Sequence, residues 1–231
     1  KLFQEARDQQ EAGNFTRAAT LYERLEGKGA GTILAQQAQI ERAYLLYKAG
    51  EKADALAAID RFIKLNPTSP AADYALYLQG LINFNDNLGF LGALSRQNLS
   101  ERDQQASRDA FQSFKQLIEQ HPQSKYAVEA RDRMGYIVNS LAEYEVHVAR
   151  YYYSRGAYVA AANRAQLTIQ EFQNSPATEE ALSILTRSYD KLGLEQLRDD
   201  AERVLKTNYP TSSLLTGVGL RETTKPWWQL W

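Results

Sequence analysis

The stretch KAGEKADALAAIDRFIKLNPTSP, residues 48–70, carries the two marks that decide the fold, a glycine and a proline on either side of a helical pattern. Gly50 follows one amphipathic segment and precedes another, where glycine suits the left-handed conformation that ends a helix. Pro67 closes the second segment, because proline lacks the backbone donor that a helix interior needs. A helix, a tight turn, a second helix of about 14 residues and a proline turn are typical of a tetratricopeptide-like pair.

This unit recurs along the chain. Its tight turns are marked by Gly13, Gly50, Gly156 and Gly193, with Gln105 in that place in the third unit, and its proline turns read LNPTSP, QHPQSK, EFQNSP and NYPTSS. Positions 5, 9 and 12 residues past each turn share one helix face and are expected in the core. They are Ala18, Tyr22, Leu25, Ala55, Ile59, Phe62, Ala110, Phe114, Leu117, Ala161, Ala165 and Thr168, and in the fifth unit, one position earlier, Ala201 and Val204.

Two segments depart from the simple repeat. An insertion of 18 residues lies near NDNLGFLGALSRQNLSERD in the third unit, and residues 124–156 contain no helix breaker except Gly135. The second segment predicts one helix of about 30 residues. We therefore predict an all-α fold, an α-solenoid of five tetratricopeptide-like helix pairs with an insertion in the third and a long bridging helix. The predicted domains are 1–125 with repeats 1–3, 126–212 with the long helix and repeats 4–5, and a Trp-rich tail at 213–231.

Composition and motifs exclude several function classes. Lys and Arg number 27 against 28 Asp and Glu, with the signs interleaved, whereas a nucleic-acid binder needs a basic stripe. The chain has no Cys, which excludes disulfides and thiol catalysis. The segment EGKGAGT, residues 26–32, lacks the spacing of a phosphate-binding loop and follows a helix, so we interpret it as a flexible inter-repeat turn. His121 and His147 are the only histidines. We expect no metal site, no cofactor and no enzymatic activity.

Tyrosines gather on the first helices of the early repeats, at Tyr44, Tyr47, Tyr74 and Tyr77. First helices line the inner surface of such a solenoid, so these rings are candidates for a groove that binds an extended, aromatic-rich peptide. The alternative is that most of them are core residues whose hydroxyls reach the rim.

Three stretches carry a family resemblance: AIDRFIKLNPTSPAADYALYLQGL (58–81), GFLGALSRQNLSERDQQASRDAFQSFKQLIEQHPQSKYAVEA (89–130) and EYEVHVARYYYSRGAYVAAANRA (143–165). They resemble the BamD (ComL) family, lipoproteins of the outer-membrane β-barrel assembly machine. The similarity runs from about residue 1 to 210 and includes the insertion and the long helix.

The resemblance implies a scaffold and receptor on the periplasmic face of the outer membrane. The N-terminal repeats would receive targeting segments of unfolded outer-membrane proteins. The C-terminal repeats would hold the POTRA domains of a BamA-like barrel subunit, with smaller lipoproteins of the complex nearby. The lipidated N-terminal Cys of the family is missing here, and we expect the sequence to begin downstream of it.

Arg164, beside Asn163 in AANRAQ, matches a family arginine that meets an acidic residue of the barrel subunit. Its neighbours Ala160, Ala161, Ala162 and Ala165 are small, which we expect to let a partner approach the helix. The alternative is an ordinary solvated surface arginine.

All three tryptophans, Trp227, Trp228 and Trp231, lie in the last five positions, in KPWWQLW. Three interpretations stay open for this tail: it covers the last repeat, docks to a partner subunit, or touches lipid. We expect this tail to be an interface element. The alternative function for the whole chain is a periplasmic tetratricopeptide adaptor in cell-envelope or cell-wall assembly.

Overall fold

The computed structural model describes residues 1–29, 31–84 and 101–216, except for the side chains of residues 101–103. Ten α-helices make up nearly all of this part, and it contains no β-strand. The chain divides into two compact units, Lys1–Gly135 and Tyr136–Trp231.

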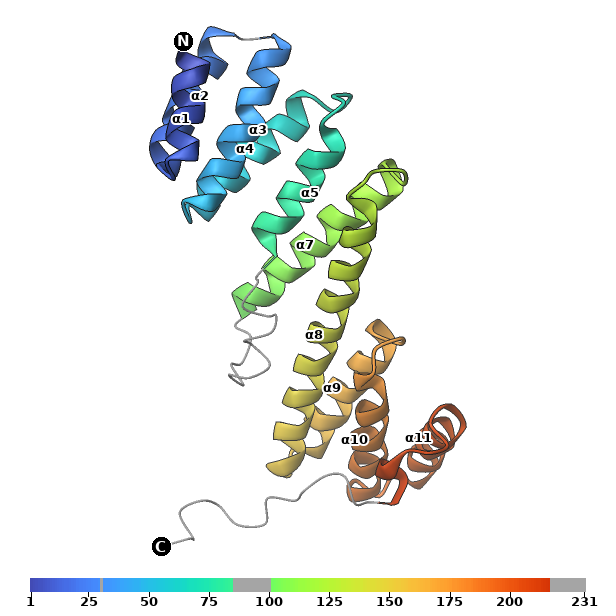
Figure 1. Cartoon of the computed structure of the whole chain (residues 1–231). Helices are drawn as coiled ribbons and strands as arrows, with labels where there is room; N and C mark the ends of the chain where they lie inside the picture. The colour runs from blue at the N-terminus through green and yellow to red at the C-terminus, as the bar shows by residue number, and fades with distance from the viewer. Residues whose placement is uncertain (30, 85–100, 217–231) are drawn as a thin grey trace, which may run out of the picture. The chain divides into compact units, whose positions relative to one another are not determined.

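The helices follow one another in pairs (Figure 1). The first three pairs are α1 (Leu2–Glu11) and α2 (Phe15–Lys28), α3 (Ile33–Lys48) and α4 (Lys52–Leu65), and α5 (Ala72–Asn83) and α7 (Glu101–Gln120). The last two are α8 (Ala127–Ser154) and α9 (Tyr158–Glu171), and α10 (Ala177–Lys191) and α11 (Glu195–Asn208), followed by a short 3-10 helix, η2 (Ser213–Thr216). The prediction of five helix pairs in an all-α fold is confirmed.

One of the two predicted departures from the simple repeat is described by the structure. The predicted insertion falls largely on residues 85–100, between α5 and α7, which lie outside the described residues. The predicted long helix is α8, with 28 residues. Gly135 lies inside α8 and is the last residue of the first unit, so α8 supplies residues to both units.

The tight turns form as predicted. The four turn glycines, Gly13, Gly50, Gly156 and Gly193, have φ between 72° and 81°, a conformation that costs other residues energy because of their Cβ atom.

The predicted core positions of the first four pairs are all buried, none of them more than 8% exposed. Tyr22, Phe62 and Phe114 are among the largest fully buried side chains. Large side chains thus fill the space between helices, while alanines on the same face let the helix axes approach.

Of the two core positions predicted on α11, Ala201 is buried, with 7% exposed, and Val204 was wrong. Val204 is 39% exposed, whereas Leu205 is 2% exposed. The turn after α11 explains this, because the Tyr209 amide donates to the Leu205 carbonyl at 2.8 Å, as the Asn66 amide donates to the Phe62 carbonyl at 2.9 Å after α4. Leu205 therefore occupies the repeat position of Phe62, whereas Arg198 and Glu202, at the other two repeat positions of α11, are only partly buried.

Candidate functional site

The first unit carries a row of aromatic and charged side chains on its first helices. Tyr77 of α5 stacks on Tyr126, just before α8, with ring centroids 4.6 Å apart and an interplanar angle of 15°. Tyr74, one helical turn before Tyr77, lies 5.4 Å from the same Tyr126 ring. The structure therefore brings Tyr74 and Tyr77 together around Tyr126, a residue that the sequence reasoning had not singled out.

The hydroxyl of Tyr77 is held by charged neighbours. Burial, and then a hydrogen bond to Glu129, raise the pKa of Tyr77 to about 12. The same hydrogen bond, together with one from Arg133 at 2.8 Å, lowers the pKa of Glu129. Tyr77 is only 8% exposed, so its ring belongs chiefly to the core of this unit.

A partly buried carboxylate, Glu41 of α3, lies next in the row. Burial raises the pKa of Glu41, while a hydrogen bond from Gln10 and the charge of Arg7 act in the opposite direction. The pKa of Tyr74 rises to about 12, first through its own burial and then through Glu41. Tyr74 is half-buried. This part of the face therefore combines an anionic acceptor with an aromatic surface.

Tyr44 and Tyr47, the other two predicted groove residues, are half-buried on α3. Tyr44 interacts electrostatically with Tyr74, which joins it to the same row. Peptide binding by Tyr44, Tyr47, Tyr74 and Tyr77 stays a prediction.

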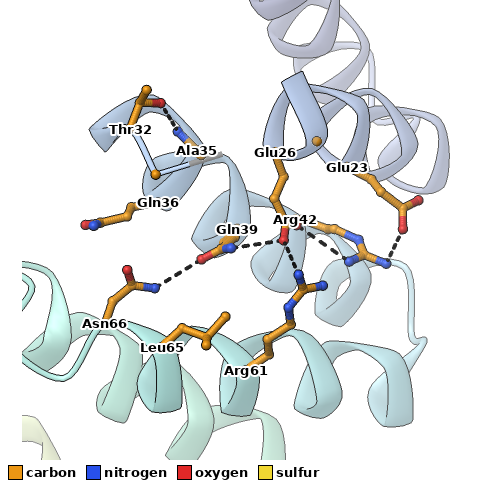
Figure 2. A pocket seen from close by; sticks show the side chains of 12 residues that line it. Glu23, Glu26, Thr32, Ala35, Gln36, Gln39, Arg42, Arg61, Leu65 and Asn66 are labelled. Carbon is orange, nitrogen blue, oxygen red and sulfur yellow. Dashed lines mark hydrogen bonds and ion pairs between the residues drawn. The ribbon is translucent and has the colours of Figure 1, made fainter. Parts of the chain in front are cut away.

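A separate cleft of about 480 Å³ lies between α2, α3 and α4. Figure 2 shows the polar network on its wall, centred on Glu26, whose side chain is 12% exposed. Gln39 donates to the Glu26 carboxylate at 2.9 Å, and Arg61 lies 3.3 Å from it. Arg42 bridges Glu26 at 3.9 Å and Glu23 at 2.9 Å. Arg42 and Arg61 are thus both paired with carboxylates, so neither gives the cleft an unpaired positive charge that would attract an anion.

The cleft opens beside EGKGAGT, of which the first three residues, Glu26–Lys28, are the end of α2 and not part of the predicted turn. Gly29 ends α2 at the repeat position where Phe172, only 6% exposed, ends α9. A Cβ atom on Gly29 would lie 3.7 Å from the Cβ of Ala35 and 3.1 Å from the hydroxyl of Thr32, both of which line the cleft. Thr32 itself accepts a hydrogen bond from the Ala35 amide and so caps α3.

In the second unit, Arg164 of α9 pairs with Glu145 of α8, Nη1 to Oε2, at 3.0 Å. The Arg164 side chain is 43% exposed and that of Glu145 only 5%. Among the described residues, Glu145 is the only charged residue that is buried. The sequence did not reveal the role of Glu145, because Glu145 and Arg164 lie 19 residues apart and meet only where α8 packs against α9.

The expectation about the alanines near Arg164 was largely wrong. Ala161, Ala162 and Ala165 are at most 4% exposed and belong to the core formed with α8 and α10. Their small size lets these helices pack closely and leaves no room for an external partner. Only Ala160 is partly exposed, and Asn163 is exposed. Docking through Arg164 and Asn163 stays a prediction.

The remaining candidate features have these outcomes. Trp227, Trp228 and Trp231 lie outside the described residues. Within the described ranges, no group of three or more His, Cys, Asp or Glu side chains is arranged to hold a metal ion. None of the helices there is long and apolar enough to cross a membrane.

Comparisons with known proteins cover almost the whole chain. Residues 1–204 match the family model YfiO, described as an outer membrane lipoprotein. The outer membrane protein assembly factor BamD of Neisseria meningitidis serogroup A is 48% identical over 231 residues, 100% of this chain and 86% of the relative. The BamD of Xylella fastidiosa strain Temecula1 is 37% identical over 94% of this chain and 74% of the relative, and that of Vibrio cholerae is 31% identical over 90% and 86%.

Among solved structures, the crystal structure of BtubC from P. vanneervenii covers 90% of this chain and 79% of its own, with 18% identity and a TM-score of 0.32, too low to support an argument from fold. The family assignment depends on the sequence relatives and the family model. Together these show that the chain belongs to the BamD family of outer membrane lipoproteins.

Proposed function

We propose that this chain acts in outer-membrane protein assembly, the role that the name of its relatives gives to them. More specifically, it is a non-enzymatic scaffold and receptor of the β-barrel assembly complex. Its place is the periplasmic face of the outer membrane, where an N-terminal lipid of the precursor anchors it. The observation that carries the proposal is the family match over residues 1–204, which covers the first four helix pairs and the fifth up to the last turn of α11.

Each half of the chain has a separate role in this proposal. Residues 1–125 receive targeting segments of unfolded outer-membrane proteins, on the face that carries Glu41 and the tyrosines. Residues 126–212 dock the POTRA domains of a BamA-like barrel subunit through the surface around Arg164, with other lipoproteins of the complex nearby. The partial exposure of Arg164 supports this, because an interface arginine needs N–H groups that a partner can reach.

The docking role is tested with purified POTRA domains and the full chain. Arg164→Gln is the informative change, because Arg164→Glu would set a second carboxylate against the buried Glu145. Arg150→Gln is the matched control, since Arg150 of α8 also pairs across helices, with Glu180 at 2.6 Å, and is half-exposed. We expect calorimetry to show at least tenfold weaker binding for Arg164→Gln and little change for the control. Equal binding by all three proteins would contradict a docking role for Arg164.

The receptor role is tested by site-specific photo-crosslinking. A photoreactive phenylalanine analogue replaces Tyr47 on α3 or, as the control, the exposed Arg24 on α2. A peptide copied from the C-terminal segment of an outer-membrane barrel protein is then added. We expect labelling from position 47 that unlabelled peptide suppresses, and none from position 24. Equal labelling from both positions would refute a specific receptor face.

A further inference from the structure

The repeat allows the pair of Glu145 and Arg164 to be compared with its counterparts in the same chain. Glu145 lies eleven residues before the turn glycine Gly156, and Arg164 lies eight residues after it. Aliphatic residues occupy these two positions in the first and fifth repeats. The counterparts are Leu2 and Leu21 in the first repeat and Leu182 and Ala201 in the fifth.

The fold therefore does not require a charged pair at this place. Leu182 is 3% and Ala201 7% exposed, so the fifth repeat packs well with apolar side chains there. Burying a carboxylate is costly, and replacing a buried ion pair by apolar residues is often neutral or stabilising. A buried Glu145 in the fourth repeat alone calls for an explanation other than stability.

The geometry suggests what this carboxylate does. Glu145 holds Arg164 through Nη1, whereas a guanidinium has five N–H donors in a planar fork. Within the described part of the chain, Glu145 is the only acidic residue at ion-pair distance from Arg164. The rest of the fork therefore has its donors available at a side chain that is 43% exposed.

We propose that Glu145 is a positioning residue: it fixes one edge of the Arg164 guanidinium, so that the other edge receives a carboxylate from a docking partner. The inference rests on the proposed docking function and adds the group that prepares the site. Arginine and carboxylate join through two parallel hydrogen bonds only when the fork is correctly oriented. A fork held in advance loses less side-chain entropy on binding.

The surroundings on α9 suit such a contact. Ala160, one turn before Arg164, and Leu167, one turn after it, lie on the same face of the helix and are both partly buried. A partner seated over them would remove water from the guanidinium, which strengthens its interaction with a carboxylate.

The test compares the full-length wild type with Glu145→Leu and Arg164→Gln by calorimetry against POTRA domains. Glu145→Leu introduces the side chain that the fifth repeat carries at this position, so it is expected to fold, which circular dichroism checks. We expect about tenfold weaker binding for Glu145→Leu, although the variant keeps Arg164 and gains one net positive charge. The double variant should bind no more weakly than Arg164→Gln alone, because Glu145 acts on the partner only through Arg164.

A second variant and a partner-free measurement keep the proposal falsifiable. Glu145→Gln preserves the shape of the side chain without its charge, and it should weaken binding in the same direction. In the absence of any partner, the Arg164 side-chain N–H resonances should be protected from exchange in the wild type and lose this protection in both Glu145 variants.

The outcomes are distinct. Wild-type binding that Arg164→Gln weakens and neither Glu145 variant changes would overturn the positioning role while leaving the docking function intact. If the wild type fails to bind POTRA domains, the docking function fails instead, and the resonances alone then decide whether Glu145 orders Arg164. Unchanged resonances in both Glu145 variants would refute the inference in either case.

Discussion

Replacing Gly80 by alanine should destabilise the first unit, although alanine is the better helix former. Gly80 is buried on α5, and a Cβ atom there would lie 2.6 Å and 2.7 Å from Cδ1 and Cζ of Phe114 on α7, and nearer still to Cε1. Ordinary contacts of a Cβ atom begin at 3.4 Å, so the Phe114 ring would have to move by nearly an ångström. Phe114 is fully buried, and the centroid of the Tyr77 ring lies 6.2 Å from its own.

The magnitude follows from two opposing effects. Alanine in place of glycine in a helix gains about 1 kcal/mol, whereas overpacking a filled core costs about 1–3 kcal/mol. Because Phe114 is fully buried, we take the upper end of the overpacking cost, about 2–3 kcal/mol, and expect a net loss of about 1–2 kcal/mol in the free energy of unfolding.

Gly135→Ala is the matched control, since Gly135 is also helical and belongs to the same unit. Apart from its chain neighbours and the backbone of its own helix, no atom of the described residues lies within 4 Å of its added Cβ, so the helix preference acts alone and should stabilise the unit by about 0.5–1 kcal/mol. Urea denaturation followed by far-ultraviolet circular dichroism compares the two variants with the wild type. If Gly80→Ala is as stable as Gly135→Ala, the close approach of α5 and α7 at Phe114 is wrong. Phe114→Leu in the Gly80→Ala background should cost less than in the wild type, because it relieves the clash.

Other predictions concern titrating groups and one turn. Burial raises the pKa of Glu41 above its ordinary value of 4.5, so the ionised carboxylate opposes folding at neutral pH. Glu41→Gln should therefore raise the melting temperature at pH 7, and this gain should shrink as the pH falls through the raised pKa. An equal gain at every pH would contradict the reasoning. Tyr74 and Tyr77, with pKa values of about 12 against an ordinary value of 10.0, should be the last tyrosines to ionise in an absorbance titration at 295 nm. Because the unfolded chain releases these protons first, stability should fall between pH 10 and 12. Gly193→Ala should cost about 1 kcal/mol in thermal denaturation, since Gly193 has φ of 72°, and an unchanged melting temperature would refute the left-handed turn.

The fold could be predicted from sequence because its determinants are local. Gly50 and Pro67 each constrain the backbone at their own position, and their spacing alone specifies a helix pair. The error at Val204 arose in a helix whose composition says little about which face is buried, because half of the residues of α11 are charged and only two are buried. Its register is set by the turn that follows, through the bond from the Tyr209 amide to the Leu205 carbonyl.

The candidate sites could be predicted only in part, because they depend on contacts between helices. Arg164 was identified by resemblance, but its partner Glu145 requires the register of α8 against α9. The alanines around Arg164 were read as an open surface, although small residues serve equally well where two helices meet. Burial distinguishes these two uses of alanine, and no local pattern in the sequence reports it.

Both units place a carboxylate where the fifth repeat has a buried aliphatic side chain. Glu41 lies nine residues before its turn glycine, as the fully buried Ile184 does in the fifth repeat, and Glu145 corresponds to Leu182 in the same way. Since an aliphatic residue packs at either position in the fifth repeat, the fold does not require a carboxylate at these places. Residues that the fold does not require are candidates for a functional role. Glu41 and Glu145 are therefore the residues to test first for the proposed receptor and docking roles, because the core alone can explain most of the tyrosines and alanines around them.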